Sequence, residues 1–328
     1  MRAKVLHTGL LLALLLTATL AIAIAITFGG PSTITPLASV NAPFAHVSID
    51  GLPAVQRWSA RDGTSLAYRH YPALAATHAN PPTRAVLIHG SSASSRSMHT
   101  LALALAQKGV VVDALDVRGH GDSGPRGDIA YIGQLEDDLA DFMRAHPFSG
   151  RNVLLGFSAG GGFALRFAGG LQQALFDRYA LLAPYLGYDA PTTRPNNGGW
   201  ASVGVPRVIA LRLLNAVGIT AFNPLPVTRF ALDDWGQRHL TPHYSYTLST
   251  NFAPHRRWRD DIAQARAPIT VLVGQNDELF APKQFAPAFA GAHPTASVAA
   301  VPQVDHMGLI LQADAVRAIV QALRQHPG

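Results

Sequence analysis

A serine flanked by glycines lies at the centre of the pentapeptide GFSAG, at residues 156–160. The pattern G-x-S-x-G is typical of a sharp strand-to-helix turn that exposes a serine hydroxyl as a nucleophile. The context fits this interpretation, because an apolar run precedes the motif at residues 153–155 and two more glycines follow it. The pattern alone is short, so a simple glycine turn after a strand is the alternative. Ser158 is the candidate nucleophile.

A serine hydroxyl needs a base to remove its proton and an acid to orient that base. Of the 14 histidines, His306 lies in the loop between the last expected strand and the last expected helix. Asp277 follows the strand expected at residues 269–273, and Glu278 beside it is the rival acid. Both positions fall at carboxyl ends of strands, where open α/β sheets build their sites. We expect a catalytic triad of Ser158, Asp277 and His306; a turn aspartate and a packed loop histidine are the structural alternatives.

Acyl transfer also needs hydrogen-bond donors for the charge that develops on the carbonyl oxygen. The backbone N–H of Ala159, directly after the nucleophile, can be one donor. The second is expected from the loop after the strand at residues 84–88, where the sequence reads HGSS. We assign it to the backbone N–H of Ser91, and we expect His89 to hold this loop rather than to act as a second base.

Short apolar runs alternate with helical patterns from about residue 55 onward, and Asp62 with Gly63 is a hairpin signal between the first two runs. Strands are expected at residues 55–60, 65–71, 84–88, 110–116, 152–157, 179–182, 269–273 and 297–301, and helices at residues 100–107, 132–146, 160–167, near 285 and from about 308. Repeated strand–helix units predict an α/β fold with a mostly parallel central sheet and helices on both faces.

Residues 185–267 interrupt this regularity and are too many for an ordinary connection within one domain. We interpret them as a cap inserted over the sheet. Val208, Leu211 and Val217 are expected to form an apolar helical face there. Aromatic residues recur through the segment, at Trp200, Phe222, Trp235, Tyr244, Tyr246 and Trp258.

The motifs together resemble a known family. The motifs are His89 with Gly90, the stretch DVRGHGDSG at residues 116–124, the GFSAG turn, GQND at 274–277 and Asp305 with His306. They are similar to those of the α/β-hydrolase superfamily, particularly its monoglyceride-lipase, lysophospholipase and serine-aminopeptidase-like branch. The resemblance covers the chain from about residue 55. It implies the α/β-hydrolase fold, the chain order serine, acid, histidine, and a structural rather than reactive role for His120 and Asp122. The cap resembles no subfamily, which leaves the substrate open.

These residues predict a serine hydrolase that cleaves carboxylic esters through an acyl-enzyme intermediate, with monoacylglycerol or lysophospholipid as candidate substrates. Hydrolysis of amides or thioesters and acyl transfer to another acceptor would use the same triad. A non-catalytic binding protein that keeps the fold is the rival from another class, although it has no need of a triad. No cofactor is expected, and the sequence does not predict an oligomeric state.

The first 28 residues are expected to lie outside the folded domain. Arg2 and Lys4 precede an uncharged apolar stretch at residues 10–28, which as a helix is about 28 Å long and matches a bilayer core. No Lys or Arg follows until Arg57, so the N-terminus is expected in the cytoplasm and the rest outside. We expect a single-pass anchor followed by a spacer at residues 29–53 and the catalytic domain at 54–328. The alternative is a cleaved signal peptide, which would make the protein secreted or periplasmic.

Composition excludes several other classes. The chain has no cysteine, which removes disulfides, thiolate metal sites and a cysteine nucleophile. Its formal charge of +6 is scattered and only 14% of residues are charged, so we expect no nucleic-acid partner. His243 and His255 stand apart in the cap, and no cluster with metal-ligand spacing is present, so no metal site is expected.

Overall fold

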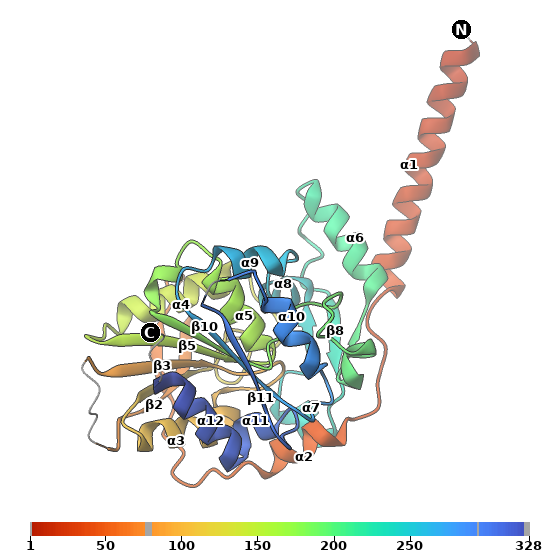
Figure 1. The fold of residues 1–328 in the computed structure, drawn as a ribbon. Helices are drawn as coiled ribbons and strands as arrows, with labels where there is room; N and C mark the ends of the chain where they lie inside the picture. The colour runs from red at the N-terminus through yellow and green to blue at the C-terminus, as the bar shows by residue number, and fades with distance from the viewer. Residues whose placement is uncertain (1, 76–80, 294, 325–328) are drawn as a thin grey trace.

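A computed structural model describes residues 2–75, 81–293 and 295–324 of the chain. Its centre is an eight-stranded sheet with the order β1-β2-β4-β3-β5-β6-β10-β11 (Figure 1). The first two strands and the β2–β4 pair are antiparallel, and all neighbours from β4 to β11 are parallel. The strands are β1 (Gln56–Ser59), β2 (Ser65–Tyr71), β3 (Thr83–Ile88), β4 (Val111–Leu115), β5 (Arg151–Phe157), β6 (Arg178–Leu182), β10 (Ile269–Gly274) and β11 (Ser297–Val301).

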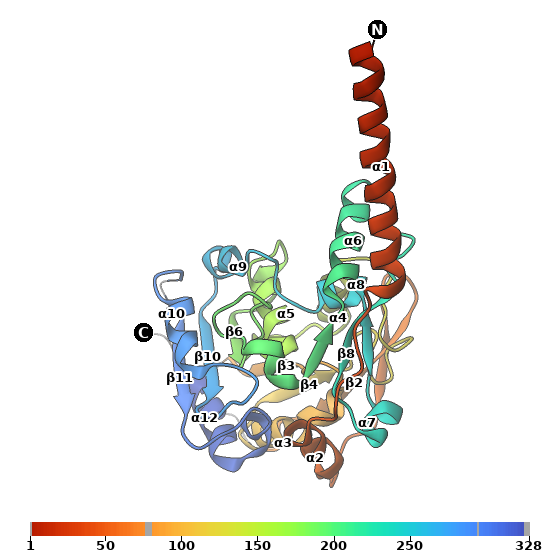
Figure 2. The ribbon, with the colours of Figure 1, turned by 90° about the vertical axis from the view of Figure 1, so that its right-hand side faces the viewer.

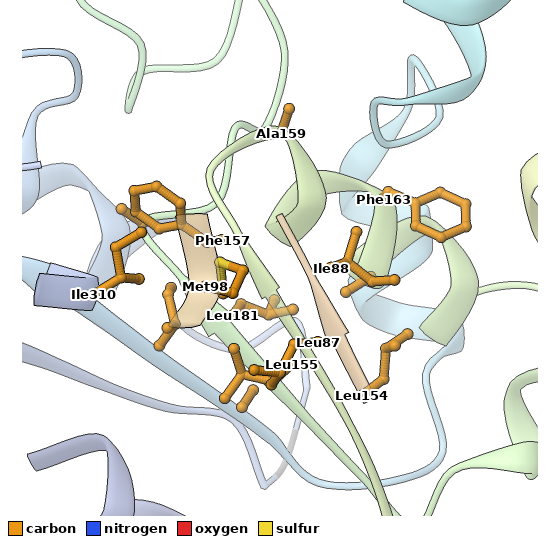
Figure 3. Close-up of a cluster of buried hydrophobic side chains, with 14 of the residues drawn as sticks. Leu87, Ile88, Met98, Leu154, Leu155, Phe157, Ala159, Phe163, Leu181 and Ile310 are labelled. Atoms are coloured by element: carbon orange, nitrogen blue, oxygen red, sulfur yellow. The ribbon is translucent and has the colours of Figure 1, made fainter. Parts of the chain in front are cut away.

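Helices cover both faces of this sheet (Figure 1). One layer contains α3 (His99–Gln107), α11 (Gly308–Leu311) and α12 (Ala313–Arg324), and the other contains α4 (Gln134–Ala145), α5 (Ala159–Ala168) and α9 (Trp258–Gln264). The short α10 (Phe285–Phe289) packs against β11 and α9. Buried leucines from neighbouring strands, such as Leu87, Leu155 and Leu181, form the core between the layers (Figure 3). The expected α/β-hydrolase architecture is confirmed.

All eight expected strands are present, each with ends within one residue of the prediction. They were recognisable because central parallel strands are buried on both faces and are therefore continuous apolar runs. The last helix differs from the prediction, because Gln312 is extended and divides it into α11 and α12.

The cap contains a second, three-stranded antiparallel sheet, formed by β7 (Ala201–Val203), β8 (Pro226–Phe230) and β9 (His243–Ser245). Around it lie α6 (Val205–Ala216), α7 (Asp234–His239) and α8 (Tyr246–Asn251). The apolar face expected on α6 is only partly correct, since Leu211 is buried but Val217 lies past the helix end and is exposed. At the end of the segment, α9 leaves the cap and packs closely on α5, where Gly169 contacts Asp261.

The N-terminal helix α1 (Arg2–Phe28) projects away from the body (Figure 2). Gly9–Phe28 is long and apolar enough to cross a membrane, and none of it is buried. The expected spacer contains α2 (Ala38–His46), which packs on the cap. Asn41 donates to the carbonyl of Ala231 at 2.7 Å and accepts from the N–H of Asp233 at 3.1 Å. Part of residues 29–53 is therefore folded against the domain rather than extended as a free linker.

Candidate active site

Ser158 occupies the turn between β5 and α5 with φ 55° and ψ −117°, a backbone conformation that is strained for a residue with a side chain. Its own N–H donates to the carbonyl of Leu182 at the end of β6, at 2.8 Å. The flanking glycines are required by space: a Cβ on Gly156 would clash with the carbonyl of Gly160, and one on Gly160 would clash with the carbonyl of His89. In Figure 3, Ala159 lies where β5 ends and α5 begins.

His306 and Asp277 meet at the carboxyl edge of the sheet, as expected. The Nδ1 atom of His306 lies 2.8 Å from Oδ2 of Asp277, and both side chains are almost fully buried. The other oxygen, Oδ1, accepts from the backbone N–H groups of Leu279 at 2.9 Å and Phe280 at 2.8 Å. Burial raises the pKa of Asp277, but the facing imidazole and the two N–H donors lower it more, so the net pKa lies below the ordinary value. The carboxylate is held ionised and can orient the imidazole.

Glu278, the rival acid, has a different place. Its Oε2 accepts from the backbone N–H of His306 at 3.1 Å, and among the described residues no hydrogen bond joins Glu278 to the ring. Glu278 therefore positions the loop that carries the histidine, and Asp277 alone contacts the imidazole nitrogen. The geometry favours Asp277 as the orienting acid.

The imidazole of His306 lies beside the serine turn. Its ring centroid is 4.8 Å from that of Phe157, the residue before Ser158, and 5.2 Å from that of Phe280. With Nδ1 facing Asp277, Nε2 is the nitrogen available to accept a proton. No hydrogen bond links Ser158 to His306 in the part of the chain that the structure describes, and such contacts are often loose until substrate binds.

The loop after β3 lies against the serine turn, since a Cβ on Gly90 would stand 3.3 Å from Cβ of Ser158. Ser92 has a left-handed backbone, with φ 67°. Its N–H donates to the hydroxyl of Tyr244 at 2.6 Å, and its Oγ donates to the carbonyl of Thr241 at 2.7 Å. The indole of Trp200 donates to Oγ of Ser91 at 2.9 Å. The cap thus fixes the loop expected to supply the oxyanion hole.

The other expected donor, Ala159, is the first residue of α5, so its N–H has no partner within the helix. A free N–H at a helix start also lies at the positive end of the helix dipole. Ser91 and Ala159 both line the same cavity.

His89 and His120 lie behind this loop and are fully buried. Nε2 of His89 accepts from the N–H of Val117 at 3.2 Å, and Nε2 of His120 lies 2.6 Å from the hydroxyl of Tyr244. Burial lowers the pKa of both imidazoles, and the neighbouring His89 lowers that of His120 further. Both rings are therefore neutral and support the loop.

The DVRGHGDSG stretch forms a structural turn. Asp116 accepts from the N–H groups of Ser95 at 2.7 Å and Asp122 at 2.9 Å. Arg118 forms a buried ion pair with Asp138 at 2.7 Å, and Oγ of Ser123 accepts from the N–H of Ala67 at 2.8 Å. These contacts, with that of His120 to Tyr244, agree with a structural role for the turn.

A cavity of about 1540 Å³ lies between the cap and the sheet edge. Its wall includes Ser91 and Ala159, together with apolar and aromatic side chains such as Trp200 and Phe280. Ser158 itself is only 6% exposed and is not part of the lining. Among the described residues, no group of three His, Asp or Glu side chains could hold a metal ion.

A family model described as serine aminopeptidase, S33, matches residues 79–310 of the chain, well over half of its length. The chain belongs to this family of hydrolases. Membership confirms the expected resemblance to the serine-aminopeptidase-like branch of α/β-hydrolases. No curated protein sequence matches the chain.

Several solved structures of other proteins have the same fold as this S33 hydrolase. A soluble variant of monoglyceride lipase from Saccharomyces cerevisiae is 18% identical with a TM-score of 0.61, and the match covers 83% of this chain and 93% of that one. The enol-lactonase from Burkholderia xenovorans LB400 is 21% identical with a TM-score of 0.57, covering 82% and 100%. A monoacylglycerol lipase from Paleococcus ferrophilus is 19% identical with a TM-score of 0.57, covering 79% and 98%. At these identities the likeness is one of fold.

Two residues near the site were not expected from the sequence. Tyr244 and Trp200 were noted only as recurring cap aromatics, yet both hydrogen-bond to the loop after β3. The sequence holds no local signal for these contacts, because the partners are more than 100 residues away along the chain.

Proposed function

We propose that the protein is a serine hydrolase that cleaves carboxylic esters through an acyl-enzyme intermediate. Ser158 is the nucleophile, His306 the general base and acid, and Asp277 the group that orients the imidazole. The backbone N–H groups of Ala159 and Ser91 hold the oxyanion. The observation that carries this proposal is the buried contact of His306 Nδ1 with Asp277, at the same sheet edge as the strained Ser158 turn.

The reaction proceeds in two halves. His306 Nε2 takes the hydroxyl proton as Oγ of Ser158 bonds to the ester carbonyl carbon, and the resulting oxyanion accepts hydrogen bonds from the N–H groups of Ala159 and Ser91. The tetrahedral intermediate collapses, the C–O bond to the alcohol breaks, and the leaving alcohol takes the proton from His306. Water then attacks the acyl-enzyme by the same route and releases the carboxylic acid and the free serine.

The cavity chemistry favours an ester over an aminopeptidase substrate. A peptide with a free N-terminus carries a positive amine, which an enzyme would hold with carboxylates. Among the described residues of the wall, Asp189 is the one acidic side chain, whereas Arg166, Arg194, Arg212 and Arg256 are cationic. Apolar and aromatic residues make up much of the remaining lining, which suits an acyl chain.

We also propose that α1 anchors the protein in the cell membrane, with the catalytic domain on the extracytoplasmic side. The basic residues Arg2 and Lys4 precede the apolar span. Cleavage of a signal peptide at the alanines near residue 23 or 25 would remove most of a helix whose last turn packs on the cap through Ile26. Ile26 lies after both sites, so either form can keep this packing, and the anchor is favoured by the length of the apolar span.

Substrate panels test the proposed reaction. Purified full-length protein in detergent is compared on a p-nitrophenyl ester, a monoacylglycerol and an alanine p-nitroanilide. We expect both esters to be hydrolysed with a higher kcat/KM than the anilide. Preferential cleavage of the anilide would identify an aminopeptidase instead. Binding of the esters without any hydrolysis would show that the protein is a binding module.

A further inference from the structure

The cap helix α6 stands directly beside α1 where α1 meets the body, in both Figure 1 and Figure 2. Arg207 of α6 donates to the carbonyls of Ile26 at 2.9 Å and Thr27 at 3.2 Å. These are among the last carbonyls of α1, which have no partners within the helix, and a cation there also complements the helix dipole. Arg207 therefore ties the cap to the end of the proposed membrane anchor.

Apolar packing reinforces this connection. Leu211, Val227 and Tyr246 form a small buried cluster apart from the main core, and Ile26 of α1 packs against it. The cluster joins α1, α6, β8 and the start of α8 into one unit. The position of α1 in a bilayer consequently sets the position of α6.

The outer side of α6 is apolar and open. Val205, Ile209, Leu213 and Val217 recur at every fourth position and are 54% to 72% exposed. Residues four apart lie on one helix face, so the first three side chains form a stripe, and the exposed Val217 follows directly after the helix. Ile219 and Phe222, in the turn after the helix, are also more than 40% exposed. Such a concentration of exposed apolar side chains on one element marks an interaction surface.

The occupant of that surface follows from the neighbouring helix. If Gly9–Phe28 spans the membrane, Phe28 marks its boundary on the side of the catalytic domain. α6 starts next to this boundary, since Gly204 contacts Gly29, and then extends along α1 away from the body (Figures 1 and 2). Its apolar stripe thus lies at the depth of lipid rather than of water. Arg212, exposed on the same helix, can extend its guanidinium to the headgroups.

We propose that α6 and residues 217–222 insert into the membrane leaflet crossed by the end of α1, and that the active-site cavity opens there to membrane lipid. This inference rests on the proposed anchoring and esterase activity. The cavity wall includes Val205, Ile209 and Arg212 from α6, Ile34 and Leu37 from the segment after α1, and the proposed oxyanion donors. A lipid ester can therefore enter from the bilayer with its acyl chain beside the apolar side chains of α6 and of the segment after α1.

A single-cysteine label tests the insertion without relying on catalysis. The chain contains no cysteine, so Leu213→Cys carries the only thiol and can be labelled with a nitrobenzoxadiazole dye. Full-length protein is placed in phosphatidylcholine vesicles that carry nitroxides on the acyl chains. We expect blue-shifted, quenched emission at position 213 and unquenched emission at Leu171→Cys. Leu171 is fully exposed and precedes β6, at the opposite edge of the parallel strands. Equal, water-like emission at both positions would overturn the proposal.

Paired variants test the lipid route. The double variant Leu213→Asp with Val217→Asp is compared with the double variant Leu74→Asp with Leu171→Asp. Leu74 and Leu171 are exposed leucines near the amino ends of the parallel strands, opposite the active site. Neither pair lines the cavity. We expect the α6 pair to lower turnover of vesicle-embedded monoacylglycerol by about tenfold or more, because charges oppose insertion, while p-nitrophenyl butyrate in solution is hydrolysed as before. Equal turnover by both pairs contradicts the lipid route. If the unsubstituted protein hydrolyses neither substrate while the label on Leu213→Cys still reports lipid, the esterase proposal alone is contradicted.

Discussion

The backbone N–H of Ser92 donates a 2.6 Å hydrogen bond to the hydroxyl of Tyr244, a cap residue 152 positions further along the chain. The same hydroxyl lies 2.6 Å from Nε2 of His120, whose Nδ1 faces the carbonyls of Val117 and Arg118. Since carbonyls only accept, Nδ1 carries the proton, and the tyrosine hydroxyl donates to Nε2. Tyr244 thereby holds the left-handed Ser92, next to the proposed oxyanion donor Ser91.

Removal of this hydroxyl should impair catalysis through the loop. In Tyr244→Phe, Ser92 and His120 each lose a buried partner, which costs about 1–3 kcal/mol of stability. We expect kcat for ester hydrolysis to fall about 10- to 100-fold with KM nearly unchanged, less than the loss caused by deleting an oxyanion donor outright.

The matched control is Tyr131→Phe, which removes an exposed tyrosine hydroxyl that donates to Asp137 on the surface. Binding of a boronic acid that mimics the tetrahedral intermediate should weaken in Tyr244→Phe and not in the control. A fall in stability with kcat and inhibitor affinity intact would assign Tyr244 a purely structural role.

The two adjacent acids should respond differently to loss of charge. Asp277→Asn is expected to lower kcat by about 10⁴-fold, because an amide favours the wrong tautomer of the imidazole. Glu278→Gln should cost little, since its amide oxygen can still accept from the N–H of His306. Steady-state rates of the two variants decide between them, and the reverse order would make Glu278 the orienting acid.

The buried pair His89 and His120 should make stability depend on pH. Burial lowers the pKa of both imidazoles in the folded protein, while the unfolded chain keeps the ordinary value near 6.5. Below that pH the unfolded chain binds more protons, so the free energy of unfolding should fall as pH drops, by up to about 1.4 kcal/mol per unit for each histidine. Urea unfolding at pH 7.5, 6.5 and 5.5 measures this slope.

Single substitutions show which histidines cause this pH dependence. His120→Gln should reduce the slope of the unfolding free energy against pH by the contribution of one histidine, even if the variant is less stable at every pH. A stability that is flat from pH 7.5 to 5.5 in the unsubstituted protein would contradict the neutral, buried state of the pair.

The elements that carry the candidate site were predictable because their signals are local. The strand before Ser158 is a buried apolar run, and the glycines beside the serine are required by backbone contacts within a few residues. The place of Asp277 and His306 follows from the rule that parallel strands direct their carboxyl ends to one edge. Their 2.8 Å contact agrees with that prediction.

The cap was predictable only as an insertion. Its sheet is built from strands of three to five residues, too short for a period to appear. The hydrogen bonds of Tyr244 and Asn41 join segments far apart in the chain, and no spacing in the sequence reveals such pairs. The residues that shape the cavity therefore required the three-dimensional structure.

The central claim is that Ser158 is the nucleophile, and covalent labelling tests it most directly. A fluorophosphonate reacts with an activated serine, and intact mass followed by peptide mapping locates the adduct. We expect one adduct, on Ser158, and none in Ser158→Ala, with ester turnover lower by up to about 10⁶-fold and folding preserved. An adduct on another serine, together with ester hydrolysis retained in Ser158→Ala, would contradict the assignment.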